Sequence, residues 1–274
     1  MRRFPLAIVT ILAATSACAA PSAQAPNPAA ALAAAVAAPS RTPANVARDV
    51  YRHPAETLAF FGIRPGDTVV EIWPGGGWFT EILAPYLAAG GGRLIAANVG
   101  GKSSGIEKLK AAQPDVYNSI TVAEFPVFDG KAAAIAPGTA DAVLTFRNVH
   151  NWRMGYTRAD KADYSADAFR QIYAMLKPGG VLGIEDHRLP ETADSERERE
   201  SGYMKPSTII RLAQAAGLTL AGSSEINANP KDSADWPDGV WTLPPTYARD
   251  DVDRAKYAAI GESDRMTLKF VKPR

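Results

Sequence analysis

The segment RNVHNW, residues 147–152, carries side chains that could move a proton beside an organic ligand. An imidazole titrates near neutral pH and can take a proton from a nucleophile, which makes His150 the candidate catalytic base. Asn148 adds a polar amide, and Trp152 adds an aromatic wall for a substrate. The alternative is a histidine packed at the end of a strand with its ring nitrogens hydrogen-bonded. The pattern therefore predicts a reaction site without naming the reaction.

Two later residues are weaker candidates for the same substrate site. His187 follows the apolar run GVLGIED and would line the same cleft, or else face solvent. Trp241 lies in ADWPDGVWTLPPTY, residues 234–247, which is too long for a tight turn. Such a segment is typical of a lid over an apolar ligand, or of a surface flap. Three histidines and one cysteine are few ligands for zinc, so we expect no metal site.

The stretch EIWPGGGWFT, residues 71–80, places three glycines in a row between two apolar segments. Glycine lets a ligand come close to the backbone, although a plain strand-to-helix turn would use the same residues. Residues 73–78, WPGGGW, lack the G-x-G-x-x-G spacing of a dinucleotide loop. The segment AANVGGKS, residues 96–103, resembles a phosphate-binding loop, but alanine replaces its first glycine. An ATPase is therefore the weakest functional interpretation.

Predicted strands and helices alternate along the chain from about residue 43. The expected strands are residues 67–73, 92–98, 119–125, 141–147, 180–187, 218–227 and 265–273. The expected helical segments are residues 43–63, split near Pro54 and ending at Gly62, and residues 77–87, 103–113, 167–177 and 206–217. Apolar strands joined by helical crossovers indicate a mostly parallel α/β sheet with helices on both faces. Ligands bind such sheets beyond the carboxyl ends of the strands. We therefore expect the glycine loop, RNVHNW and His187 to meet at one edge.

The segment DTVVEIWPGGGWFTEILAPYL resembles motif I of the class I S-adenosylmethionine-dependent methyltransferases. In that motif a strand ends in an acidic residue and runs into a glycine-rich loop. Glu71 takes the acidic position, and Gly75 and Gly77 match the later glycines. The resemblance implies a Rossmann-like, seven-stranded sheet with an antiparallel last strand. It also implies S-adenosylmethionine as cofactor, with Glu71 near the loop and the ligand's ammonium group.

The resemblance extends over most of residues 44–272. FDGKAAAIAPGTADAVLTF places Asp129 at the family's adenine-contacting position, and MLKPGGVLGIEDH resembles the family's helix–turn–strand stretch. RNVHNW would face the transferred methyl group, with Arg147 among the cofactor-binding residues. The N-terminal segment and FRNVHNW together resemble a subgroup of exported, predicted methyltransferases.

Two positions depart from the family pattern. Trp73 replaces the first glycine of motif I, and Asn98 stands where an acidic residue usually accepts hydrogen bonds from the ribose hydroxyls. An amide makes weaker bonds to hydroxyls than a carboxylate does, so the affinity for the cofactor is in question. Asn98 is equally suited to a turn or a helix cap.

The N-terminus predicts export. Residues 1–25 contain two arginines, a short apolar core and small residues, the pattern of a cleaved signal peptide. Cleavage after Ala25 would release a soluble protein, whereas TSAC up to Cys18 resembles a lipobox and would leave a lipid tether to the membrane. Residues 26–43, rich in alanine and proline, indicate a linker, and residues 44–274 the methyltransferase domain. We expect a periplasmic location, either soluble or membrane-anchored.

These observations predict an exported enzyme that moves a methyl group to a small or medium organic acceptor. A net charge of +1 gives no global field for nucleic acid, so we expect no such partner. S-adenosylmethionine is made inside cells, which motivates an alternative function. That alternative is a binding protein that kept the methyltransferase fold and lost catalysis, as Trp73 and Asn98 suggest.

Overall fold

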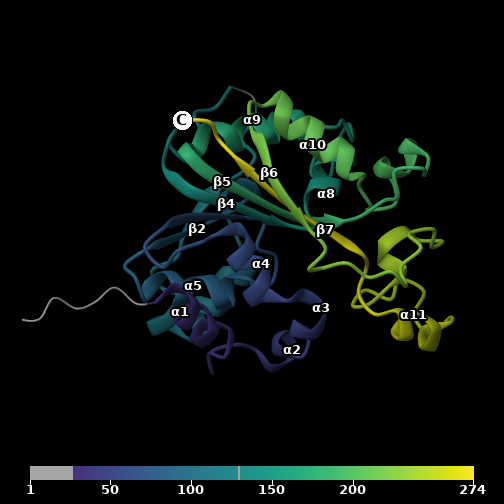
Figure 1. Ribbon diagram of the computed structural model, residues 1–274, viewed down its shortest axis with the longest axis horizontal. Helices are drawn as coiled ribbons and strands as arrows, with labels where there is room; N and C mark the ends of the chain where they lie inside the picture. The colour runs from purple at the N-terminus through teal and green to yellow at the C-terminus, as the bar shows by residue number, and fades with distance from the viewer. Residues whose placement is uncertain (1–26, 129) are drawn as a thin grey trace, which may run out of the picture.

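A single seven-stranded sheet organises the computed structural model, which describes residues 27–128 and 130–274 (Figure 1). The strand order is β3-β2-β1-β4-β5-β7-β6. The strands are β1 Thr68–Ile72, β2 Arg93–Asn98, β3 Thr121–Glu124, β4 Ala140–Phe146, β5 Leu176–His187, β6 Thr219–Ser224 and β7 Arg265–Val271. Strands β1 to β5 pair in parallel, and β7 runs antiparallel between β5 and β6. The predicted fold class is confirmed.

Helices cover both faces of the sheet (Figure 1). On one face lie α1 Pro28–Val36, α4 Pro54–Phe61, α5 Thr80–Ala88, α6 Ser104–Ala112 and α7 Pro114–Tyr117; on the other lie α8 Val149–Arg153, α9 Ser165–Met175 and α10 Pro206–Ala215. Three further short helices, α2 Pro43–Val46, α3 Asp49–Arg52 and α11 Arg254–Ile260, lie toward the carboxyl edge (Figure 1). The 3-10 helices are η1 Val99–Gly101, η2 Ser195–Arg199 and η3 Gly239–Thr242.

The central strands are buried on both faces because each carries an apolar run. Every residue of β1 is buried, including Val69 and Val70, whose side chains enter opposite core layers. Leu58 and Phe61 bring α4 into one layer, and Gly62 then ends that helix with a left-handed backbone. This layered core holds the carboxyl ends of the strands in place.

The segment expected to be a linker differs in the structure. From residue 28 it forms α1, which begins at Pro28 under an Asn27 cap and buries Leu32 and Ala35 against the layer that contains α4 and α5. Alanine has the highest helix propensity, and the apolar stripe has a partner surface, so the segment packs instead of remaining extended. The predicted signal segment and Cys18 lie outside the described residues.

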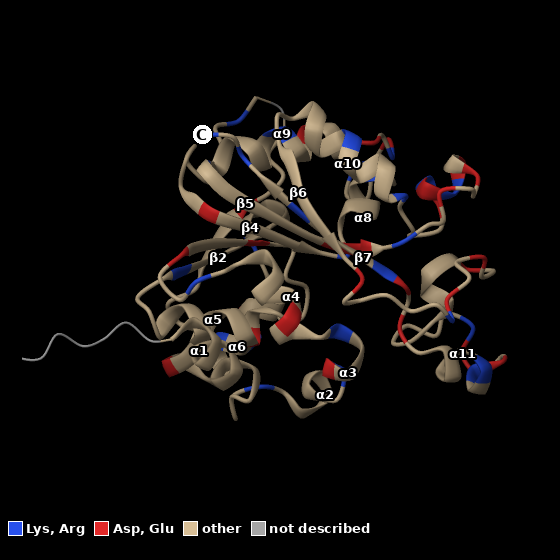
Figure 2. Cartoon of the chain, in the orientation of Figure 1, with Lys and Arg blue, Asp and Glu red and all other residues tan. Residues whose placement is uncertain are grey.

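Two other elements depart from expectation. The fourth strand was expected to reach Arg147, but β4 ends at Phe146 and Val149–Arg153 forms α8 directly after it. The LKPGG stretch does not only end the preceding helix, because β5 already begins at Leu176 and pairs past an irregularity near Ala140. None of the described helices is both long and apolar enough to cross a membrane. Basic and acidic residues are interspersed over the elements in view, without a continuous basic stripe (Figure 2).

Candidate functional site

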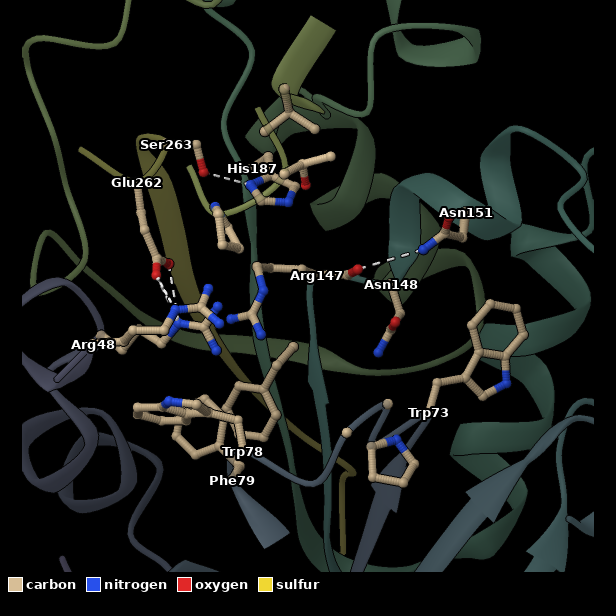
Figure 3. Close-up of a pocket in the computed structure, with 18 of the residues that line it drawn as sticks. Arg48, Trp73, Trp78, Phe79, Arg147, Asn148, Asn151, His187, Glu262 and Ser263 are labelled. Carbon is tan, nitrogen blue, oxygen red and sulfur yellow. Dashed lines mark hydrogen bonds and ion pairs between the residues drawn. The ribbon is translucent and has the colours of Figure 1, made fainter. Parts of the chain in front are cut away.

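A cavity of about 410 Å³ opens at the carboxyl ends of β1, β4 and β5 (Figure 3). The glycine loop after β1 forms one wall, and α8 with the end of β5 forms another. The long β6–β7 connection and the α2–α3 segment close the remaining sides. Its polar lining is Asn45, Arg48, Arg52, Glu71, Arg147, Asn148, His150, Asn151, His187, Thr246, Glu262 and Ser263, and its apolar lining includes Trp73, Trp78, Phe79, Phe146, Val240, Trp241, Pro244 and Pro245.

His150 lies in the first turn of α8 and is bound to a buried carboxylate. Its Nδ1 lies 2.9 Å from Oδ1 of Asp186, at the end of β5. Asp186 also accepts hydrogen bonds from the backbone N–H groups of Val149, His150 and His187, which fix the carboxylate in one orientation. An aspartate that accepts from Nδ1–H leaves Nε2 of the neutral ring free to accept a proton. This is the arrangement that a general base requires.

His187 shares the cavity wall with His150, and their ring centroids lie 5.2 Å apart. Its Nδ1 lies 2.6 Å from the Ser263 hydroxyl oxygen. Burial holds the pKa of His187 well below its usual value, and the neighbouring His150 and arginines lower it further. His187 is therefore neutral at physiological pH and can serve as a hydrogen-bonding wall for a ligand.

The same residues have metal-ligand chemistry, since ligand atoms of His150, Asp186 and His187 all lie within 4.8 Å of one another. Both oxygens of Asp186 are already engaged by three backbone N–H groups and one imidazole. A cation would have to displace part of that network. The expectation of no metal site stays a prediction, and the hydrogen bonding favours it.

Glu71 is the last residue but one of β1, before the glycine loop, and lines the cavity. Its Oε2 accepts a 2.6 Å hydrogen bond from the Thr80 hydroxyl, at the start of α5. Burial raises the pKa of Glu71 to about 7, although that hydrogen bond and the Arg147 guanidinium favour the ionised form. The carboxyl group is thus poised to ionise when a cationic group approaches.

The three glycines after β1 have different roles. Gly75 and Gly77 have positive φ angles of 59° and 88°, which favour glycine. Gly77 does not line the cavity, and a Cβ atom there would lie 2.6 Å from Cδ1 of Leu109 in α6. Gly75 and Gly76 line the cavity, and a Cβ on either would meet nothing within 4 Å. The loop therefore exposes its backbone at Gly76, and Gly77 serves packing.

A substitution at Gly76 tests this loop without backbone strain. We expect Gly76→Asp to weaken the binding of a cavity ligand at least about tenfold, because a carboxylate would take up ligand space. Gly76→Ala is the matched control, since a methyl group meets nothing there. Calorimetry measures binding, and an unchanged melting temperature shows that the fold is intact. Equal ligand affinity in the aspartate variant and the wild type would remove the loop from the site.

Trp73 crosses the sheet edge where the family motif has glycine. Its φ is 50°, a left-handed conformation that a glycine adopts at lower cost. Its backbone N–H donates to the Ala97 carbonyl oxygen (2.8 Å), and its indole N–H donates to the Phe125 carbonyl oxygen (2.8 Å). The indole thus reaches from the end of β1 over β2 to the end of β3, and it lines only the near part of the cavity.

Asn98, expected to hold the ribose of the cofactor, does not line this cavity. Asn98 donates from Nδ2 to the Lys102 carbonyl oxygen at 2.6 Å, which is the alternative turn role for this residue. Asp129 lies outside the described residues. The structure thus brings together Glu71, Trp73 and the glycine loop, but not Asn98.

The predicted residues around β4 are divided by the structure. Asn148 lines the cavity, and its Nδ2 donates to the Ile72 carbonyl oxygen (3.0 Å) and the Thr145 hydroxyl (3.2 Å), so the amide joins the ends of β1 and β4. Trp152 is not at the site: its side chain is fully buried beside Trp73 and points into the core. Helix α8 turns it away from the cavity that His150 faces.

Trp241 lines the cavity, as the lid interpretation requires, with its ring 6.2 Å from the His150 ring. It belongs to the β6–β7 connection, in which Val240 and the prolines that follow also line the cavity.

Arg147 follows β4 with a φ of 62°, an unusual conformation for a residue with a side chain. Its backbone N–H donates to the Glu185 carbonyl oxygen, and Nη1 lies 3.2 Å from Oε1 of the same residue. These bonds direct the guanidinium group into the cavity (Figure 3).

An ion-pair network beside Arg147 was missed by sequence reasoning. Glu262 binds Arg48, Arg52 and Arg265, with N···O distances of 2.7, 3.0 and 3.1 Å. Arg265 also reaches Glu185 at 3.0 Å, which links the network to Arg147. Arg48 and Arg52 are four residues apart in a predicted helix, so the sequence could have predicted that their side chains lie on the same face. Glu262 and Arg265 come from the other end of the chain, and no sequence pattern predicted that they would meet these arginines.

Comparison with known proteins identifies the fold. No protein-family profile matches the sequence, and no curated protein shows significant similarity to it. A provisionally assigned sarcosine dimethylglycine methyltransferase from Galdieria sulphuraria has a TM-score of 0.54 at 14% identity, over 82% of this chain and 84% of its own. An S-adenosylmethionine-dependent methyltransferase from Aquifex aeolicus has a TM-score of 0.52 at 13% identity, over 89% and 98% of the two chains. This is the class I methyltransferase fold.

The methyltransferase fold also occurs in a protein named for other chemistry. The cyclase SpnF has a TM-score of 0.51 at 16% identity, over 81% of this chain and 80% of its own. Function therefore has to be argued from the residues of the cavity.

Proposed function

We propose that this protein transfers a methyl group from S-adenosylmethionine to a small or medium organic acceptor. The observation that carries the proposal is the His150–Asp186 pair, whose imidazole faces the same cavity as the glycine loop after β1. In the methyltransferase fold this edge of the sheet joins a ligand-binding loop to the end of β4. A base at that place can deprotonate an acceptor held against the loop.

The chain's residues fit the methionine end of S-adenosylmethionine. The cofactor would supply an electrophilic methyl group, and Glu71 would hold its ammonium group while the backbone at Gly75 and Gly76 allows close approach. Methyl transfer is an in-line displacement, so the protein must align acceptor and methyl group and exclude water. Trp241 and the prolines of the lid supply the apolar cover.

A binding protein without catalysis is the second candidate, and Trp73 favours it. Its indole is hydrogen-bonded across the end of β2 to the Phe125 carbonyl, over the strand from which the cofactor's ribose would be held. Asn98, at that strand's end, donates to its own turn. Adenosine binding in the family's manner would require the indole to move or to act as a stacking surface.

Calorimetry with S-adenosylmethionine and its demethylated product separates the two functions. We expect both to bind the mature chain, and a methyl-transfer assay over phenols, thiols and carboxylic acids to reveal an acceptor. Binding of either compound without transfer to any compound in a broad panel of extracts would support the binding protein. An absence of heat with both compounds would contradict both proposals.

The affinity for S-adenosylmethionine should depend on pH through Glu71. Its pKa of about 7 leaves the carboxyl group mostly neutral below that pH and ionised above it. A cationic ammonium group prefers the ionised form, so affinity should rise by up to about tenfold from pH 6 to pH 8. Glu71→Gln is the control, because it should flatten this part of the profile. A wild-type profile that matches the glutamine variant would exclude a Glu71–ammonium contact.

We further propose that the protein acts outside the cytoplasm. The support is the sequence of residues 1–25, and TSAC leaves lipidation of Cys18 as a second form. Cell fractionation with N-terminal mass analysis tests this. A chain that starts at Pro26 is expected for a soluble periplasmic form, and acylated Cys18 for a membrane-anchored one. An intact Met1 in the cytoplasm would contradict export.

A further inference from the structure

The cavity carries more positive charge than its carboxylates can balance. Four guanidinium groups, Arg48, Arg52, Arg147 and Arg265, share two carboxylates, Glu185 and Glu262, and with Asp186 at the same edge of the sheet the formal surplus is one positive charge. The remaining acid of the cavity, Glu71, has a pKa of about 7 and is only partly ionised at neutral pH. Buried charges of one sign are costly unless a partner neutralises them.

Three arginines, Arg48, Arg52 and Arg147, line this cavity. Arg48 and Arg52 each bind Glu262 through Nε, at 2.7 and 3.0 Å, so neither uses its terminal NH₂ groups in these two bonds. Nη2 of Arg48 is buried without a hydrogen-bond partner among the described residues. The Arg52 side chain is only 4% exposed, and its guanidinium lies over the Trp78 ring. Guanidinium groups gathered in one cationic pocket are suited to receiving an anion.

The charge of Arg52 shows how crowded this cluster is. Burial, followed by repulsion from Arg147, lowers the pKa of Arg52 to about 8. Glu262 opposes that shift, but the other arginines add to it. A bound anion among these groups would relieve the repulsion.

From this geometry we infer that Arg48, Arg52 and Arg147 bind a carboxylate or phosphate group of the methyl acceptor. Arginine forms paired, charge-assisted hydrogen bonds with both groups. Trp78 and Phe79 lie below the arginines and provide a flat apolar surface for the rest of the molecule (Figure 3). The acceptor is then an organic anion whose charged end lies at the arginines and whose nucleophile lies toward His150.

The charge of the cavity favours the methyl acceptor, and not the cofactor, as the molecule whose anionic group binds the arginines. S-adenosylmethionine has a carboxylate, an ammonium and a sulfonium group, so it is itself a cation. Its binding adds positive charge to a site that already has a surplus, whereas an anionic acceptor removes it. The two ligands should therefore bind cooperatively. This inference rests on the proposed function only in assigning the anion to a methyl acceptor.

The first test is calorimetry on the mature chain without cofactor. The probes are inorganic phosphate, 4-hydroxybenzoate and its neutral isostere 4-hydroxybenzamide. We expect phosphate and the benzoate to bind, and the benzamide to bind at least about tenfold more weakly because it lacks the charge-assisted bonds. Heat from neither anion, or equal affinity for the benzoate and benzamide, would overturn the inference. That result would leave the proposed function intact if S-adenosylmethionine still binds.

Variants locate the anion. Arg48→Gln should weaken 4-hydroxybenzoate about 10- to 100-fold, and Arg147→Gln is the second cavity variant if the first does not fold. Arg170→Gln removes the same charge from the outer surface of α9, where the side chain is 64% exposed, and should change nothing. If the cavity and surface variants weaken 4-hydroxybenzoate equally, the binding depends only on the net charge of the protein. That result would overturn the inference.

The last test separates the acceptor's anion from the cofactor's carboxylate. Saturating 4-hydroxybenzoate should tighten S-adenosylmethionine several-fold, about the size of a typical coupling between sites. Arg48→Gln should weaken neither S-adenosylmethionine nor its decarboxylated analogue, because it removes positive charge from a site that both cations enter. A loss confined to S-adenosylmethionine would assign the arginines to the cofactor's carboxylate and overturn the acceptor assignment. If the anions bind but neither cofactor compound does, the anion site stands and the methyltransferase proposal fails.

Discussion

Replacing His150 with alanine is expected to lower the rate of methyl transfer by about 10²- to 10⁴-fold, the usual contribution of a general base. The affinity for S-adenosylmethionine should change little, because the imidazole is bound to Asp186 and faces the acceptor side of the cavity. The measurement is a turnover assay on the best acceptor found, with cofactor affinity taken from calorimetry.

A second histidine gives the matched control for this variant. His53 lies outside the main cavity, near Asn227, and has a left-handed backbone that asparagine tolerates. His53→Asn should therefore keep full turnover. Full turnover by His150→Ala would show that the His150–Asp186 pair is structural and that the acceptor needs no base.

Trp152→Ala should lower the free energy of unfolding by about 3–5 kcal/mol, the range for removing a large aromatic side chain from a core. The Trp152 side chain is 0% exposed and packs against Trp73, Phe125 and Phe169. Its indole N–H is buried without a partner in the described part of the chain, so the loss comes from packing and not from a hydrogen bond. Denaturant unfolding monitored by circular dichroism measures the change.

Trp241→Ala is the comparison for that experiment. Trp241 is half-buried in the lid and lines the cavity. We expect a loss of unfolding free energy below about 1.5 kcal/mol, together with weaker binding of an aromatic ligand, because half-exposed side chains lose less packing. Equal destabilisation by the two substitutions would mean that the lid belongs to the core.

Sequence patterns were sufficient for most of the scaffold. Apolar strands, helical periodicity and the breaks at Gly62 and Pro54 predicted the order of the elements and the edge of the sheet at which the site lies. The prediction succeeded because strand burial and helix amphipathicity are local properties that repeat along the chain. The linker prediction was wrong for residues 28–36, since the apolar stripe of α1 is recognisable only when the partner surface is known.

Position along the chain did not determine where side chains point. His150 and Trp152 are two residues apart, yet α8 turns one into the cavity and the other into the core. The sequence pattern did not predict this short helix, whose geometry sets the two side chains on different sides. The sequence also did not distinguish the glycines of the loop. Gly76 lines the cavity, whereas Gly77 packs against Leu109.

The sequence by itself determined the fold class, the glycine loop and the histidine after the fourth strand, because each depends on residues close together in the chain. Only the tertiary structure decided the chemistry around them. It brought Asp186 to His150, laid Trp73 over the end of β2, and joined Arg48 and Arg52 to Glu262 from the far end of the chain. Such contacts arise from packing between distant segments, and their electrostatic effect depends on burial that no local pattern records.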